Sequence, residues 1–150
     1  MNFSKLPSIR LITILVGLFF ISSCGSGTSS SNPANEVSAS YSLSGSAQKG
    51  PLISGSYVWV SELDESLESI GKTYITQTTD YLGHFRLGSN ISSNLVEIIA
   101  DGYFMDETTG GLSTSKIAMS SIADLSIDSS PTVNILTTLQ VPRLKVLMDT

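Results

Sequence analysis

The order of apolar and polar positions divides the chain into three regions. Residues 11–21 are almost continuously apolar, and residues 25–40 are mainly Gly, Ser, Thr and Asn. From residue 41 on, short runs of Val, Ile, Thr and aromatic residues alternate with clusters of Gly, Asp and Ser. This last pattern is typical of β-strands joined by turns.

The alternating region predicts an all-β domain over residues 41–136. In its strongest segment, Val58 and Val60 share one face of a strand while Tyr57 and Trp59 share the other. Turn signals about every 8–15 residues favour an antiparallel sandwich or barrel, and about 95 residues suit a seven-stranded sandwich. The expected strands cover residues 40–47, 56–63, 72–79, 84–88, 94–104, 116–127 (as one or two strands) and 131–136.

The end of the sequence predicts a short helix over residues 137–150, with Pro142 in its first turn, where the missing N–H costs nothing. Apolar side chains surround Arg143 and Lys145. An isolated helix of this length is marginal. Either it packs on the sandwich, or the chain is a fragment whose helical continuation is missing.

The start of the sequence has a pattern typical of an export signal. Lys5 and Arg10 precede an uncharged stretch at 11–21, and small residues follow. A basic start, an apolar run of roughly 7–15 residues and a small-residue exit describe a secretory signal peptide. A transmembrane helix would need about 20 apolar residues.

The leader ends in Ile21-Ser22-Ser23-Cys24, which resembles the lipobox of bacterial lipoproteins. The resemblance implies a signal peptide over residues 1–23, cleavage between Ser23 and Cys24, and a diacylglycerol thioether (with further acylation, such as palmitate) on Cys24. Membrane binding through this lipid anchor would follow. The alternative is an ordinary leader whose cysteine is simply removed.

The residues from Cys24 onward predict the membrane in which the protein is anchored and the presence of a tether. Gly25 stands where an aspartate signals inner-membrane retention in many Gram-negative bacteria, so the resemblance implies the outer membrane. Residues 24–40 carry too few apolar groups to fold and should form a disordered tether. Since Cys24 is the only cysteine, no intramolecular disulfide is expected.

The charge of the chain limits its partners. The formal net charge is −5, and the chain without residues 1–23 has six basic and thirteen acidic residues, or −7. This balance argues against nucleic-acid binding and against docking on anionic lipid through a basic patch.

A second resemblance covers roughly residues 43–105. Val58 and Val60, the turn from Thr79 and Asp80 to Gly83 and Phe85, and the strand end at 100–103 resemble the carboxypeptidase regulatory-like domain, a transthyretin-like β-sandwich. In that family the domain is usually an accessory or binding module without catalytic residues. The resemblance therefore implies a non-enzymatic role.

The histidine and the acidic residues are weak candidates for a metal or catalytic site. His84 is the only histidine, so it lacks partners for a zinc site or a Ser-His-Asp triad. The acidic run (Glu62, Asp64, Glu65 and Glu68) and a second acidic loop (Asp101, Asp106 and Glu107) could hold calcium or supply paired carboxylates, but they lack EF-hand spacing and read better as solvated loops. No cofactor or metal is expected.

The aromatic residues offer a possible ligand face. Tyr57, Trp59 and Tyr74 could line a sheet surface that stacks on a glycan or contacts an envelope protein; alternatively they belong to the core. The sequence thus predicts a lipid-anchored envelope lipoprotein with a structural, adhesive or ligand-binding module. The alternative is an accessory domain of an exported peptidase or glycan hydrolase whose catalytic part is absent.

Overall fold

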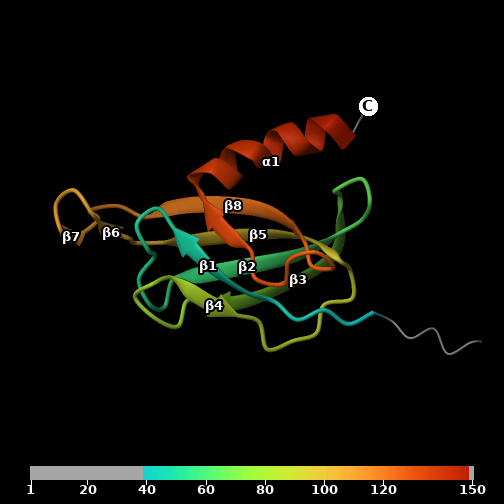
Figure 1. Cartoon of the computed structure of the whole chain (residues 1–150), viewed down its shortest axis with the longest axis horizontal. Coiled ribbons are helices and arrows are strands. Elements are labelled where there is room, and N and C mark those ends of the chain that lie inside the picture. The colour runs from blue at the N-terminus through green and yellow to red at the C-terminus, as the bar shows by residue number, and fades with distance from the viewer. Residues whose placement is uncertain (1–38, 149–150) are drawn as a thin grey trace, which may run out of the picture. The chain divides into compact units, whose positions relative to one another are not determined.

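The computed structural model describes residues 39–148 (Figure 1). The signal peptide, the cleavage site, Cys24 and nearly all of the tether lie outside these residues. The described part contains nine strands and one helix: β1 (Ser44–Gln48), β2 (Tyr57–Leu63), β3 (Ser69–Gln77), β4 (His84–Arg86), β5 (Leu95–Gly102), β6 (Met105–Asp106), β7 (Gly111–Leu112), β8 (Ile117–Asp124), β9 (Thr132–Asn134) and α1 (Ile135–Met148).

The strands form two main sheets and a small hairpin. The larger sheet has the order β3-β2-β5-β8 and is antiparallel throughout; the smaller has the order β4-β1-β9. The prediction of a mostly antiparallel β domain followed by a helix is confirmed. The count of seven strands is not, because residues 105–112, which lie between two expected strands, form the β6–β7 hairpin. Moreover, β1 and β9 pair in parallel.

One hydrophobic core takes side chains from both sheets. Val58 and Val60 on β2 and Val96 and Ile98 on β5 are fully buried, as the period of two predicts. Phe85, from the smaller sheet, is 2% exposed and joins the same cluster. Burial of each such side chain contributes roughly 1.5–3 kcal/mol.

The turn before β4 is fixed by one carboxylate and one glycine. Asp80 Oδ1 accepts hydrogen bonds from the backbone N–H groups of Leu82 and His84, at 2.9 and 3.0 Å. Gly83 has a φ of +75°, and a Cβ there would collide with the carbonyl oxygen of Ala47. The expected turn role of Gly83 is confirmed, and the close approach brings this turn against β1.

Helix α1 begins two residues earlier than predicted. Asn134 Oδ1 accepts the backbone N–H of Thr137 at 3.0 Å, which is an N-cap. Pro142 therefore lies inside the helix, and its expected position in the first turn is wrong. The N-cap decides the start because it satisfies a helix donor that would otherwise be unpaired.

Threonine side chains attach α1 to the edge of the larger sheet. The backbone N–H of Ser120 on β8 donates to Thr138 Oγ1 at 2.9 Å, and Thr137 Oγ1 donates to the Ser120 carbonyl at 2.8 Å. Farther along α1, Lys145 Nζ lies 3.0 Å from Glu97 Oε2 on β5. Figure 1 shows α1 running above β8, as these contacts require.

Candidate functional site

Tyr57 and Trp59 form an aromatic pair on the face of β2 that points away from the core. Their ring centroids lie 5.7 Å apart, with an angle of 29° between the planes. The side chain of Tyr57 is 46% exposed, although that of Trp59 is partly covered. The predicted shared face of these two residues is confirmed.

Apolar residues from both neighbouring strands extend this surface. In the sheet register, Trp59 stands opposite Ile75 on β3 and opposite Ile99 on β5. Ile75 is 62% exposed and Ile99 is 37% exposed. Trp59 therefore lies in the middle of an apolar strip that crosses three strands and is open to solvent. Grouped exposed apolar residues of this kind mark interaction surfaces more often than single ones do.

Tyr74 does not belong to the aromatic face. It stands opposite Val60 in the register, so its side chain lies on the core side of the larger sheet. The ring packs against the core, and the hydroxyl donates to Glu62 Oε1 at 2.7 Å. The structure brings Tyr57 and Trp59 together but assigns Tyr74 to the interior.

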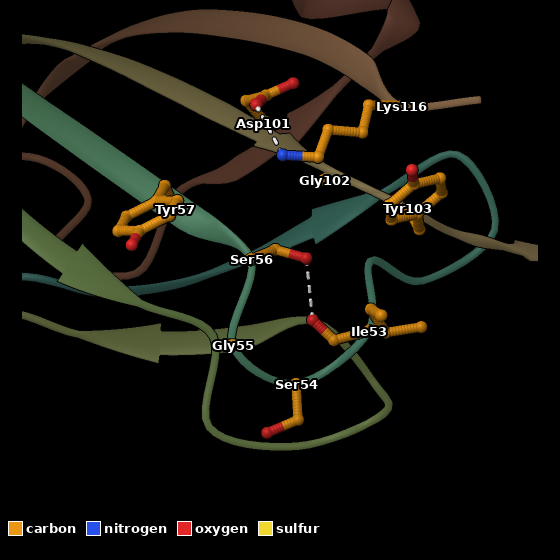
Figure 2. Close-up of a pocket in the computed structure, with 9 residues that line it drawn as sticks. All are labelled: Ile53, Ser54, Gly55, Ser56, Tyr57, Asp101, Gly102, Tyr103 and Lys116. Atoms are coloured by element: carbon orange, nitrogen blue, oxygen red, sulfur yellow. Dashed lines mark hydrogen bonds and ion pairs between the residues drawn. The ribbon is translucent and has the colours of Figure 1, made fainter.

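A hollow of about 230 Å³ opens beside Tyr57, at the end of β2 (Figure 2). Asp101 on β5 is the register partner of Tyr57 and lies on the same face of the sheet. Lys116 Nζ lies 3.7 Å from Asp101 Oδ2 and 5.9 Å from the centre of the Tyr103 ring. The aromatic pair thus leads into a pocket that carries one carboxylate and one ammonium group.

Hydrogen bonds of Ser56 fix the turn that lines the hollow. Ser56 is buried, and its hydroxyl donates to the carbonyl oxygen of Ile53 at 2.8 Å, the bond drawn in Figure 2. The backbone N–H of Ser56 donates to Thr78 Oγ1 at 2.9 Å. Gly102 lies directly against this turn, so a Cβ at that position would collide with the Ser56 side chain. This close approach of Gly102 to Ser56 therefore depends on the absence of a side chain at position 102.

The structure corrects the interpretation of Glu62 as a solvated loop residue. Its side chain is fully buried on the core face of β2, at the opposite end of the strand from the hollow. The carboxylate accepts hydrogen bonds from the Tyr74 hydroxyl and from the Ser92 backbone and hydroxyl, at 2.7, 3.0 and 2.7 Å. A further bond comes from the Ser93 backbone at 3.2 Å.

The electrostatics of Glu62 follow from these contacts. Burial raises the pKa of the carboxyl group, but the hydrogen bonds from Ser92 and Tyr74 and the charge of Lys72, 3.7 Å away, lower it to about 2 overall. Glu62 is therefore ionised and held by donors on every side, which suits a structural anchor. The period of two places Glu62 on the same face as Val58 and Val60, but nothing in the sequence identifies Ser92 and Ser93 as its partners.

His84, Asp64, Asp80 and Asp106 make hydrogen bonds within the turns in which they lie. His84 Nδ1 lies 2.7 Å from Asp80 Oδ2, and this hydrogen bond is the main reason that the pKa of Asp80 is lowered. In residues 39–148, no three His, Cys, Asp or Glu side chains are grouped so that they could hold a metal ion.

The part of the chain that the structure describes contains no helix with the length and apolarity needed to cross a membrane. No family model matches the chain, and neither a curated protein nor a solved structure matches it. Function is therefore inferred from the residues and geometry above.

Proposed function

We propose that this chain is a bacterial envelope lipoprotein anchored through Cys24, with a non-catalytic β-sandwich module that binds a ligand on the Tyr57–Trp59 face. The lipid would hold the module at the membrane, most simply the outer membrane. The ligand would be a glycan or an envelope protein. No step of bond breaking is assigned to the module.

The observation that carries the binding role is the stacked Tyr57–Trp59 pair on the outer face of the sheet, in which Tyr57 is exposed and Trp59 is partly covered. Aromatic side chains bury large apolar areas and normally contribute most when they face the core. Here the only tryptophan of the chain lies on the outer face of the sheet, between Ile75 and Ile99. A ligand that covers this strip would remove apolar surface from water, which is favourable at roughly 25 cal/mol per Å².

The sheet arrangement supports the transthyretin-like sandwich as the architecture of the module. The two larger sheets have four and three strands, and one core takes side chains from both. The β6–β7 hairpin would then be an addition to a seven-stranded frame. The anchor is supported by the basic start, the apolar run at 11–21 and the position of Cys24 directly after it.

The anchor is tested by metabolic labelling with a palmitate analogue, followed by membrane fractionation. We expect the wild-type chain to carry the label and to sediment with membranes, and both properties to vanish in Cys24→Ala. An exported, unlabelled and soluble wild-type chain would refute the anchor and leave the binding module to be judged separately.

The ligand face is tested by sedimentation of the detergent-solubilised protein with detergent-washed envelope fragments. We expect Trp59→Ala to reduce co-sedimentation while its circular dichroism spectrum stays that of the wild type. Tyr81→Ala is the matched control, because Tyr81 is a 69% exposed aromatic residue in the turn before β4. Equal loss in both variants, or no loss in either, would contradict a specific role for this face.

A further inference from the structure

We infer that the hollow beside Tyr57 binds one unit of a neutral saccharide through two adjacent hydroxyl groups, while the sugar chain continues over Trp59. This inference rests on the proposed ligand-binding role of the Tyr57–Trp59 face and names the chemical class of its ligand.

The charge of the hollow favours a ligand without net charge. Asp101 and Lys116 are the two charged residues among those that line it, and they carry opposite signs. The two charges offset each other, so the hollow gives neither an anion nor a cation a net electrostatic attraction. A neutral ligand with both donors and acceptors can use both groups at once.

The Asp101–Lys116 pair is open to such a ligand. Its 3.7 Å separation exceeds a hydrogen-bond distance, so the two groups attract each other without satisfying each other. The side chains are 30% and 50% exposed respectively, and both lie at the hollow. A carboxylate only accepts hydrogen bonds and an ammonium group only donates them.

Adjacent hydroxyl groups match this pair. Each hydroxyl can donate one hydrogen bond and accept others. One hydroxyl can therefore donate to Asp101 while its neighbour accepts from Lys116, and both bonds are strengthened by the charge of the protein group. Sugar rings present such neighbouring hydroxyls together with apolar C–H faces.

The aromatic side chains supply the second requirement of a sugar site, an apolar platform. Tyr57 is 46% exposed and Tyr103 is 37% exposed, and both line the hollow. Figure 2 shows Tyr57 and Tyr103 at different sides of the hollow, with Lys116 and Asp101 near the end of β5. The Tyr103 ring also holds Lys116 through a cation–π contact.

The site is largely preformed, which lowers the entropy cost of binding. The buried Ser56 hydroxyl fixes the turn from Ile53, and Gly102 packs directly against Ser56. From the hollow, the stacked rings of Tyr57 and Trp59 give a sugar chain a continuous path along β2.

The chain carries its own probe, because Trp59 is its only tryptophan. The full-length protein is titrated with gluco-, galacto- and manno-configured neutral tetrasaccharides while tryptophan fluorescence is followed, and calorimetry confirms each affinity. Asp101→Asn keeps the side-chain size, Lys116→Gln shortens the side chain, and each change removes one charge. Glu65→Gln, an exposed carboxylate in the turn after β2, is the matched control.

We expect at least one of these saccharides to bind saturably, and both site variants to bind it at least about tenfold more weakly, the loss expected for one charge-assisted hydrogen bond. Glu65→Gln should bind like the wild type. Circular dichroism of each variant should match that of the wild type, and a Trp59→Phe variant, followed by calorimetry, should keep part of the affinity.

Two results would overturn the inference but leave the proposed binding face standing, and a third would refute that face as well. Saccharide binding that needs Trp59 but tolerates both site variants would leave the aromatic face as a ligand site and remove the hollow from it. If none of the saccharides binds while envelope fragments still do so in a Trp59-dependent manner, the ligand belongs to another class, such as protein. Loss of Trp59 dependence in the fragment assay as well would refute the proposed binding face itself.

Discussion

Replacement of the buried Glu62 tests whether an ionised carboxylate stabilises the sheet. Glu62→Gln keeps the shape of the side chain but puts an amide nitrogen where one carboxylate oxygen accepts hydrogen bonds. Donors from Ser92, Ser93 and Tyr74 then face a group with one acceptor oxygen fewer. Loss of a buried hydrogen-bonded charge is among the more costly single changes in a protein.

The magnitude follows from the pKa of the group. Folding lowers the pKa of Glu62 from 4.5 to about 2, and each unit corresponds to about 1.4 kcal/mol. The charged form therefore contributes at most about 3 kcal/mol to the free energy of unfolding. Because the folded pKa is the lower one, this contribution is complete above pH 4.5 and is lost as the pH falls toward 2.

The assay is urea unfolding followed by circular dichroism at several pH values between 7 and 2.5, on wild type, Glu62→Gln and Glu65→Gln. We expect Glu62→Gln to be less stable at pH 7 by about 2–3 kcal/mol, and the difference from wild type to shrink below pH 4.5. Glu65→Gln should stay within about 0.5 kcal/mol of wild type, as exposed substitutions usually do. A difference between wild type and Glu62→Gln that does not change with pH would refute the reasoning, because it would mean that the charge of Glu62 contributes nothing.

Two further substitutions test the turn at Gly83 and the Glu62 site. Gly83→Ala should lower the free energy of unfolding by more than about 2 kcal/mol, because the added Cβ would collide with the Ala47 carbonyl and alanine is strained at a positive φ. The control Gly71→Ala has a φ of +84° but open space around it, so it should cost only roughly 1 kcal/mol. Equal urea midpoints for the two variants would show that the collision with Ala47 contributes nothing. Tyr74→Phe should cost roughly 1.5–3 kcal/mol by removing a donor to the Glu62 carboxylate, and should raise the pKa of that carboxyl group, measured by NMR titration; an unchanged pKa would show that the bond does not hold the charge.

The strands that the sequence predicts well are those with one buried face. On β2 and β5, apolar residues alternate with exposed ones, so the period of two identifies both the strand and its inward side. The same rule placed Tyr57 and Trp59 together on the face opposite Val58 and Val60. It could not place Tyr74, because the face of one strand relative to another depends on the register between them.

The features that the sequence missed depend on contacts between distant residues. Glu62 looks like a member of an acidic loop until Ser92 and Ser93, 30 and 31 positions away, are brought against it. The parallel pairing of β1 with β9 joins residues 86 positions apart, such as Ser46 and Thr132. Local patterns contain no information about such pairs. The early start of α1, by contrast, had a local signal in Asn134 and Thr137, which form its N-cap.

The buried Glu62 and the proposed binding face lie at opposite ends of strand β2 and on opposite sides of it. Glu62 points into the core near one end of the strand, whereas Tyr57 points outward at the other end. Five residue steps of about 3.3 Å separate them by about 16 Å. Sites at this separation usually contribute independently. The Trp59 side chain lies on the opposite face of β2 from Glu62, and it is not a member of the core cluster that includes Val58 and Val60. An aromatic side chain outside the core cluster, next to a preformed hollow with an open charge pair, is what a ligand site on a stable sheet requires.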